Sequence, residues 1–227
     1  MEKIKIISDS TCDLSKELIE EHNIELIPLY VNFNEESYLD GVNLTVPEMY
    51  NLVEKKNTLP KTAAPSPGAF VEVFKKYLDQ GYKIIYLGLG SKFSATFSSA
   101  NVAKQTLESE DIYLVDSGNL SSGTGLLILK AAKFIKEGLT AEEVKEKLEE
   151  LVPKVRSQFV IDTLDYLYKG GRLNALSAFF GSMLKIKPII KVRDGVMAVG
   201  KKGRGTIKKG IDLMLQEVFH EKDNIDP

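Results

Sequence analysis

Three short stretches rich in hydroxyl groups carry residue types that could bind an anion. They are Ser8-Asp9-Ser10-Thr11, Gly88-Leu89-Gly90-Ser91 and Asp116-Ser117-Gly118, and each follows a short apolar run. Hydroxyl groups and the free amides at a helix start are good donors to a carboxylate or a phosphate. Serine, threonine and aspartate are also good helix N-caps, and this purely structural interpretation stays open for each of them.

The pattern around these stretches predicts strands that alternate with helices. Strand, loop and helix follow one another over residues 3–19, 83–107 and 111–136. This alternation predicts a parallel sheet covered by helices on both faces. Because ligands bind at the carboxyl ends of the strands in such a sheet, we expect Ser10, Ser91, Ser117 and Gly118 near one site at that edge.

Other elements have local signals of their own. Thr45 with Glu48, and Thr140 with Glu143, have capping-box spacing, and Ser66-Pro67 is a good helix start. We also expect a strand over residues 25–33, a loop over 34–43 with a turn at 40–41, a loop over 61–68, a strand over 156–161, and short helices over 164–169 and 176–184.

The pattern changes near residue 155. Asp194-Gly195 lies between apolar runs at 187–193 and 196–201, and an Asp-Gly pair in this setting predicts a tight hairpin. We therefore expect a three-layer α/β/α domain with a parallel sheet over residues 1–155. A second, α+β domain with a mixed or antiparallel sheet is expected over residues 156–227.

Composition excludes several classes of protein. The chain has 30 Lys and Arg against 32 Asp and Glu, which is not the strongly basic balance of a dedicated nucleic-acid binder. No apolar run approaches the roughly 18 residues that span a bilayer. Cys12 is the single cysteine, so no internal disulfide can form, and with two histidines it makes a zinc site improbable. We expect a cytoplasmic protein without a metal.

Glycine-loop and hydrolase motifs are incomplete. Gly88-Leu-Gly90 has Phe93 where a dinucleotide fingerprint needs a third glycine, and the run from Gly195 to Lys202 lacks the hydroxyl that completes a P-loop. Two basic features stay open between a structural role and an anionic ligand or acidic partner. They are Arg172 at a helix end and the patch from Lys201 to Lys209.

Several motifs in order along nearly the whole chain resemble the DegV proteins, the bacterial fatty-acid-binding subunits of a fatty acid kinase system. The motifs are Ser8-Asp-Ser-Thr-Cys-Asp-Leu14, Ile27-Pro-Leu29, Tyr38-Leu-Asp40, Lys61-Thr-Ala-Ala-Pro-Ser66, Ser91-Lys-Phe-Ser-Ala-Thr-Phe97, Asp116-Ser117, Leu167-Tyr-Lys-Gly-Gly-Arg172 and Lys185-Ile-Lys-Pro188. The resemblance implies a non-catalytic carrier that encloses one long-chain fatty acid in a tunnel between two domains and needs no cofactor. A separate, dihydroxyacetone-kinase-like subunit would phosphorylate the carboxyl group, and transient membrane contact is left open.

The resemblance also implies roles for individual residues. Thr62 and Ser94 match the hydroxyls that hold the carboxylate, although Ala63, Ala64 and Ala95 replace the commoner Ser, Gln and Gly. Arg172, and less closely Arg204, match positions suited to a partner or an anion. The tunnel wall would include Leu176, Phe179, Phe180, Met183 and Ile186, for which a simple core role stays equally open. Family members continue into further strands, so the resemblance implies a second domain that is shortened here.

An enzyme remains the alternative from another class. It would act on a small phosphorylated or hydroxylated metabolite at the same strand-end edge. A long apolar tunnel favours the carrier, whereas a short polar pocket favours the enzyme.

Overall fold

The structure is a computed structural model that describes residues 2–172 and 186–220. Two compact units make up the chain, residues 1–155 and residues 156–227. The elements of the first unit are β1 (Ile4–Asp9), η1 (Ser10–Cys12), α1 (Lys16–Glu21), β2 (Glu25–Ile27), β3 (Tyr30–Phe33), β4 (Glu36–Leu39), α2 (Val46–Lys56), β5 (Lys61–Ala63), α3 (Pro67–Leu78), β6 (Lys83–Gly88), α4 (Thr96–Leu107), β7 (Ile112–Asp116), α5 (Ser122–Lys136), α6 (Ala141–Leu151) and η2 (Val152–Lys154). Those of the second are β8 (Gln158–Val160), α7 (Asp165–Lys169), β9 (Ile186–Arg193), β10 (Val196–Arg204) and α8 (Ile207–His220).

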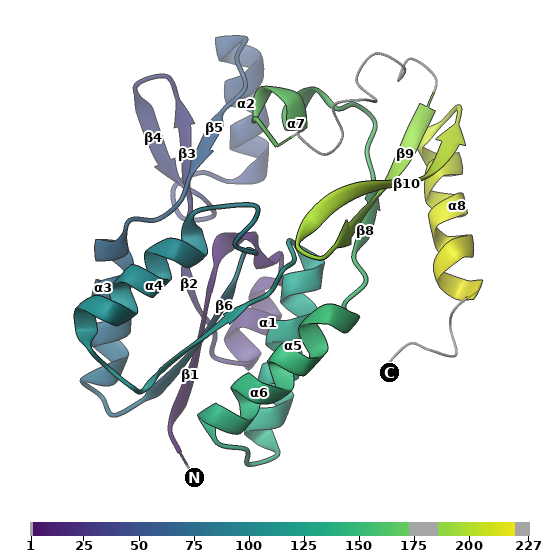
Figure 1. Cartoon of the computed structure of the whole chain (residues 1–227). Coiled ribbons are helices and arrows are strands. Elements are labelled where there is room, and N and C mark those ends of the chain that lie inside the picture. The colour runs from purple at the N-terminus through teal and green to yellow at the C-terminus, as the bar shows by residue number, and fades with distance from the viewer. Residues whose placement is uncertain (1, 173–185, 221–227) are drawn as a thin grey trace. The chain divides into compact units, whose positions relative to one another are not determined.

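A four-stranded parallel sheet forms the centre of the first unit, with strand order β2-β1-β6-β7. Helices α3 and α4 cover one face of this sheet, and α5 and α6 cover the other (Figure 1). Because both faces are covered, the inner strands β1 and β6 are buried along almost their whole length, as parallel strands usually are.

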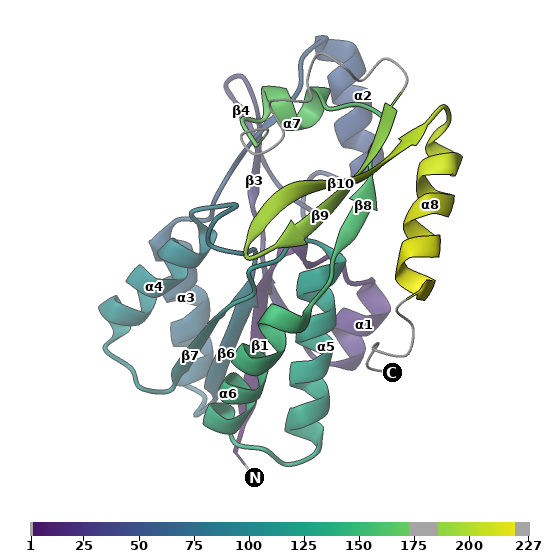
Figure 2. The ribbon, with the colours of Figure 1, turned by 45° about the vertical axis from the view of Figure 1, so that its right-hand side comes forward.

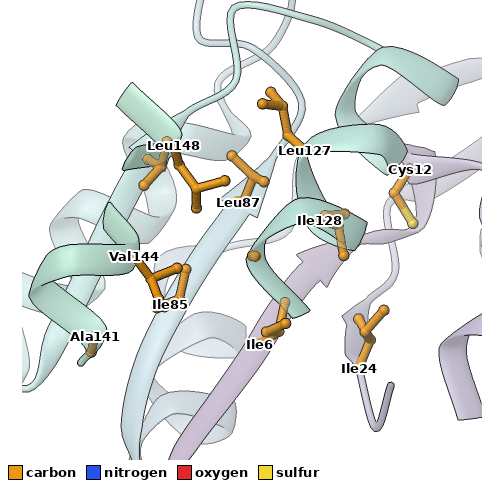
Figure 3. Packing of buried hydrophobic residues seen from close by; sticks show 12 residues of the cluster. Ile6, Cys12, Ile24, Ile85, Leu87, Leu127, Ile128, Ala141, Val144 and Leu148 are labelled. Atoms are coloured by element: carbon orange, nitrogen blue, oxygen red, sulfur yellow. The ribbon is translucent and has the colours of Figure 1, made fainter. Parts of the chain in front are cut away.

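Two apolar clusters lie on opposite faces of the sheet. One joins Ile6, Ile85 and Leu87 of the strands to Leu127 and Leu148 of the helices (Figure 3). The other contains Phe70, Phe74, Tyr86 and Ile112, among others, with Phe70 and Tyr86 in edge-to-face contact at 5.2 Å between ring centroids. Full burial of such side chains contributes roughly 1.5–3 kcal/mol each, so these clusters hold the strand ends in fixed positions.

The predicted helix starts are confirmed. Thr45 with Glu48, and Thr140 with Glu143, each form a complete capping box. Ser66 accepts a hydrogen bond from the Ala69 N–H, and Pro67 is the first residue of α3. A cap of this kind contributes about 1 kcal/mol to a helix.

Three predictions for residues 25–68 are wrong in detail. The predicted strand over 25–33 is split at Pro28 into β2 and β3, which belong to different sheets. The predicted loops over 34–43 and 61–68 contain β4 and β5, which pair with β3 on either side as an antiparallel sheet. Proline has no N–H for the ladder, so a sheet strand cannot easily run through it.

The second unit contains an antiparallel sheet with strand order β10-β9-β8. The hairpin between β9 and β10 turns at Asp194 and Gly195 as predicted, and both have positive φ angles, 51° and 72°. Helix α8 packs on this sheet and lies beyond the last predicted element (Figure 2). The parallel sheet between helix layers and the separate antiparallel sheet confirm the predicted fold class. The predicted helix over 176–184 lies outside the described residues.

Candidate carboxylate-binding site at the strand ends

Loops that follow β1, β6 and β7 are joined by hydrogen bonds at the carboxyl edge of the parallel sheet. The Gly90 N–H donates to the Asn119 carbonyl at 2.8 Å, and the Ser91 N–H donates to Asp116 Oδ1 at 3.0 Å. The approach is so close that a Cβ on Gly90 would lie 2.9 Å from the Asn119 nitrogen. The structure therefore brings Ser91 and Gly118 into adjoining, cross-linked loops.

Ser117 is buried between two of these loops. Its Oγ donates to the Gly88 carbonyl at 2.7 Å and accepts from the Asn119 N–H at 3.1 Å. Thr124 Oγ1 lies 3.2 Å from the same oxygen. Gly118 has a positive φ of 54°, and its N–H donates to Asp116 Oδ1 at 3.0 Å. The Ser117 hydroxyl is thus already engaged in joining the loops and is not free for a ligand.

Ser10 is engaged in a similar way. Its Oγ donates to Asp40 Oδ2 at 2.7 Å and accepts from the Leu29 N–H at 3.2 Å. These contacts join the end of β1 to the chain around β3 and β4. The Ser10 hydroxyl is therefore already used both as a donor and as an acceptor. Ser10 lies near the strand-end edge but holds the fold there rather than offering a free hydroxyl to a ligand.

Asp9 holds the centre of the network and is fully buried. Its Oδ1 accepts from the Thr11 N–H at 3.0 Å and the Thr11 hydroxyl at 2.6 Å. Its Oδ2 accepts from the Leu89 N–H at 2.7 Å and the Tyr86 hydroxyl at 3.2 Å. Burial raises the pKa of Tyr86, and the charge of Asp9 raises it further, so the phenol stays protonated and donates.

Ser94 lies at the start of α4 and is half-buried. Its Oγ is 2.8 Å from Thr96 Oγ1 and accepts from the Thr96 N–H at 3.2 Å. The amides of Phe97 and Ser98 have no partner in the part of the chain that the structure describes. A hydroxyl beside two free amides at a helix start is suited to a carboxylate.

Thr62 is exposed on β5, where it pairs with Val31 of β3. Within residues 2–172 and 186–220, its hydroxyl has no hydrogen-bond partner, and no hydrogen bond joins it directly to Ser94. Both residues belong to the first unit. The exposed Thr62 hydroxyl thus differs from the hydroxyls of Ser10 and Ser117, which join separate loops of the fold. The half-buried Ser94 hydroxyl is intermediate, because it contacts Thr96 at the start of its own helix.

The remaining predicted residues belong to the second unit. Arg172 is exposed, and its Nη1 donates to the Gly170 carbonyl at 2.7 Å just after α7, in keeping with a helix-end role. Arg204 is exposed at the end of β10, where it pairs with half-buried Ile186 of β9. The other predicted tunnel residues lie outside the described residues: Leu176, Phe179, Phe180 and Met183.

Asp9, Asp116, Asn119 and Thr124 contribute to the strand-end network but were not among the predicted site residues. The signal available for the first two was their position, since each is the last residue of a parallel strand. Asn119 joins Gly90 through its backbone carbonyl, and no sequence pattern indicates such a contact.

No group of three or more His, Cys, Asp or Glu side chains is placed to hold a metal within the described residues. Among residues 2–172 and 186–220, no helix is long and apolar enough to span a bilayer. An open depression of about 470 Å³ lies along α4, β7 and α6, and none of the predicted site residues lines it.

Comparisons with known proteins agree with this architecture. Residues 3–226 match a family model described as "Uncharacterised protein, DegV family". A DegV domain-containing protein of Clostridium perfringens is 46% identical over 217 residues, which is 96% of this chain and 77% of that protein.

Solved structures are similar as well. A stearic-acid-binding protein from Eubacterium ventriosum superposes with a TM-score of 0.87 at 32% identity, over 97% of this chain and 78% of that one. DegV of Bacillus subtilis, described as a fatty acid binding protein, superposes with a TM-score of 0.85 at 34% identity, over 98% of this chain and 79% of that one. The chain therefore belongs to the DegV family.

Proposed function

We propose that this protein is a cytoplasmic carrier that binds one long-chain fatty acid and holds its carboxylate with the hydroxyls of Thr62 and Ser94. The observation that carries the proposal is the half-buried Ser94 hydroxyl at the start of α4, beside the Phe97 and Ser98 amides, which have no partner among residues 2–172 and 186–220. Fatty acid binding in the related structures from Eubacterium ventriosum and Bacillus subtilis supports it.

The energetics divide between the tail and the head of such a ligand. Burying each methylene contributes about 0.8 kcal/mol, so some 14 methylenes offer on the order of 11 kcal/mol before the cost of association. A carboxylate that leaves water must recover its lost hydration through hydrogen bonds, and hydroxyls and helix-start amides supply them. The tail therefore gives affinity, while the head fixes the position of the carboxylate.

Hydroxyl and amide donors hold a carboxylate without transferring a proton to it. The carboxylate then keeps the electron pair with which it can attack the terminal phosphorus of ATP held by a separate kinase, releasing ADP and leaving an acyl phosphate. In this proposal the kinase supplies ATP and magnesium, and the DegV chain supplies no catalytic residue.

Charge distribution supports an acidic partner for the second unit. Residues 156–227 carry 13 Lys and Arg against 8 Asp and Glu, a net of +5, whereas residues 1–155 carry 17 against 24, a net of −7. Arg204, Lys208 and Lys209 are exposed at the end of β10 and the start of α8. We infer that this basic surface, with Arg172, contacts the kinase through opposite charge.

The test is binding of stearate to delipidated protein, with three single variants. Thr62→Ala and Ser94→Ala should each weaken binding by roughly tenfold to a hundredfold, because a hydrogen bond to a charged group contributes roughly 1.5–3 kcal/mol. Thr106→Ala removes an exposed hydroxyl elsewhere on α4 and should leave affinity unchanged. Equal affinity in all four proteins would contradict the assigned site, and no saturable binding by the wild type would contradict the function.

A further inference from the structure

We propose that Asp9 is a positioning residue for the carboxylate site, because it fixes the loop that carries Ser94. This inference rests on the fatty acid binding proposed above. Asp9 touches no ligand in this account; it acts through the backbone of the β6–α4 loop. Its buried carboxylate joins that loop to the end of β1.

The start of the β6–α4 loop is held at each of four successive residues. The contacts are Gly88 O with Ser117 Oγ at 2.7 Å, Leu89 N with Asp9 Oδ2 at 2.7 Å, Gly90 N with Asn119 O at 2.8 Å, and Ser91 N with Asp116 Oδ1 at 3.0 Å. Three of these contacts come from the β7 side of the sheet, and Asp9 supplies the contact from β1. The loop is thus fixed from both neighbouring strands before it reaches Ser94.

The Asp9 carboxylate lies so close to Gly88 that it leaves no space for a side chain there. A Cβ on Gly88 would lie 2.3 Å from Asp9 Oδ2, so this position admits only glycine while the carboxylate is in place. In the described part of the chain no lysine or arginine forms an ion pair with Asp9. Its charge is therefore stabilised by the four donors of Thr11, Tyr86 and Leu89.

An ionised carboxylate is needed to satisfy both sets of donors at once. Both oxygens of Asp9 accept, one from Thr11 and the other from Leu89 and Tyr86. In Asp9→Asn, the amide NH₂ would face either Thr11 or the pair formed by Leu89 and Tyr86, and donors on that side would lose their acceptor. The variant keeps the shape of the side chain but releases one of the two loops.

Release of the β6–α4 loop should weaken the hydrogen bonds to the carboxylate of the ligand. It should leave the contacts with the hydrocarbon tail unchanged. The Ser94 hydroxyl and the first amides of α4 follow directly from the segment that Asp9 holds. An acid and an alcohol of equal chain length share the same tail and differ in the charge of the head. Comparing the two ligands therefore separates a positioning role from general loss of structure.

The experiment measures dissociation constants of stearic acid and stearyl alcohol for the delipidated full chain and its variants. Asp9→Asn should weaken binding of the acid by about tenfold and of the alcohol by less than about twofold, because the charged head depends most on placed donors. Asp13→Asn makes the same change on an exposed carboxylate four residues beyond Asp9, in the segment that follows β1. This control should alter neither dissociation constant. Asp13 has a φ of 52°, which asparagine tolerates.

Tyr86→Phe provides a second test if Asp9→Asn fails to fold. It removes the 3.2 Å hydrogen bond to Asp9 Oδ2 but keeps the ring packing, so it should shift the acid alone and by a smaller factor. Unchanged acid affinity in the folded variants, or an equal loss for acid and alcohol, would overturn the positioning role. If the wild type itself binds no acid, the proposed function fails instead.

Discussion

Glu2 Oε2 accepts a hydrogen bond of 2.9 Å from the backbone N–H of Ala141, the first residue of α6. Glu2 Oε1 lies 2.6 Å from Lys83 Nζ at the start of β6. The Glu2 carboxylate therefore joins the first residue of α6 to the parallel sheet. Its negative charge also suits the positive end of the α6 dipole.

This contact predicts a pH-dependent stability. The hydrogen bond from Lys83, with that from Ala141, lowers the pKa of Glu2 below its ordinary 4.5. The unfolded chain then binds more protons than the folded one in the acid range, so the contribution is complete above about pH 4.5 and is lost as the pH falls through the folded pKa. Glu2→Gln should cost roughly 1 kcal/mol at pH 7 and less at pH 3.

Urea unfolding at several pH values measures this effect. Glu146→Gln alters an exposed carboxylate on α6, the helix whose first residue Glu2 contacts, and serves as the control. A wild-type advantage over Glu2→Gln that stays constant from pH 7 to pH 3 would show that the contact does not depend on ionisation.

A glycine pair predicts the effect of overpacking in the second unit. A Cβ on Gly210 of α8 would lie 2.7 Å from Val160 Cγ1 of β8, and a Cβ on Gly203 would lie 2.9 Å from the Gly210 Cα. Gly210→Ala should therefore destabilise the docking of α8 by about 1–3 kcal/mol, although alanine favours helix. The measurement is hydrogen exchange of the α8 amides.

Gly68 offers a matched comparison. It also lies in a helix, but a Cβ there would meet its nearest atom at 3.7 Å, an ordinary contact. Gly68→Ala should be neutral or stabilising by up to about 1 kcal/mol. We expect Gly210→Ala to speed hydrogen exchange of the α8 amides and Gly68→Ala to leave exchange of the α3 amides no faster than in the wild type. An unchanged exchange rate in α8 would contradict the close approach of Gly210 to β8.

The first unit should fold without the second. Both apolar clusters of the parallel sheet lie wholly within residues 1–155. A fragment that ends at Val155 should therefore give a cooperative unfolding transition and dispersed amide resonances in an NMR spectrum. A fragment with the spectrum of an unfolded chain would contradict the proposal that residues 1–155 form a domain.

Local signals explain why most elements of the fold could be predicted. Capping boxes at Thr45 and Thr140 and the Asp194-Gly195 turn depend on neighbours within a few residues, so the sequence displays them directly. Strand β5 has no such signal, because its three residues are exposed and are fixed by pairing with β3. Local sequence patterns therefore miss elements, such as β5, whose structure depends on residues far away in the chain.

The same distinction applies to the site. The position of the hydroxyl-rich loops follows from strand alternation, whereas the role expected of Ser94 is implied by the family resemblance. The burial of Asp9 and the commitment of Ser117 to the Gly88 carbonyl depend on packing between strands far apart in the chain. A hydroxyl's availability to a ligand is therefore a property of the fold, which residue type alone does not reveal.

Native mass spectrometry of the protein as isolated from bacterial cells tests the central claim most directly. The account predicts a chain that carries one long-chain fatty acid, which solvent extraction removes and added stearate restores at a ratio of one to one. A bare chain that takes up no fatty acid after extraction and addition would contradict it.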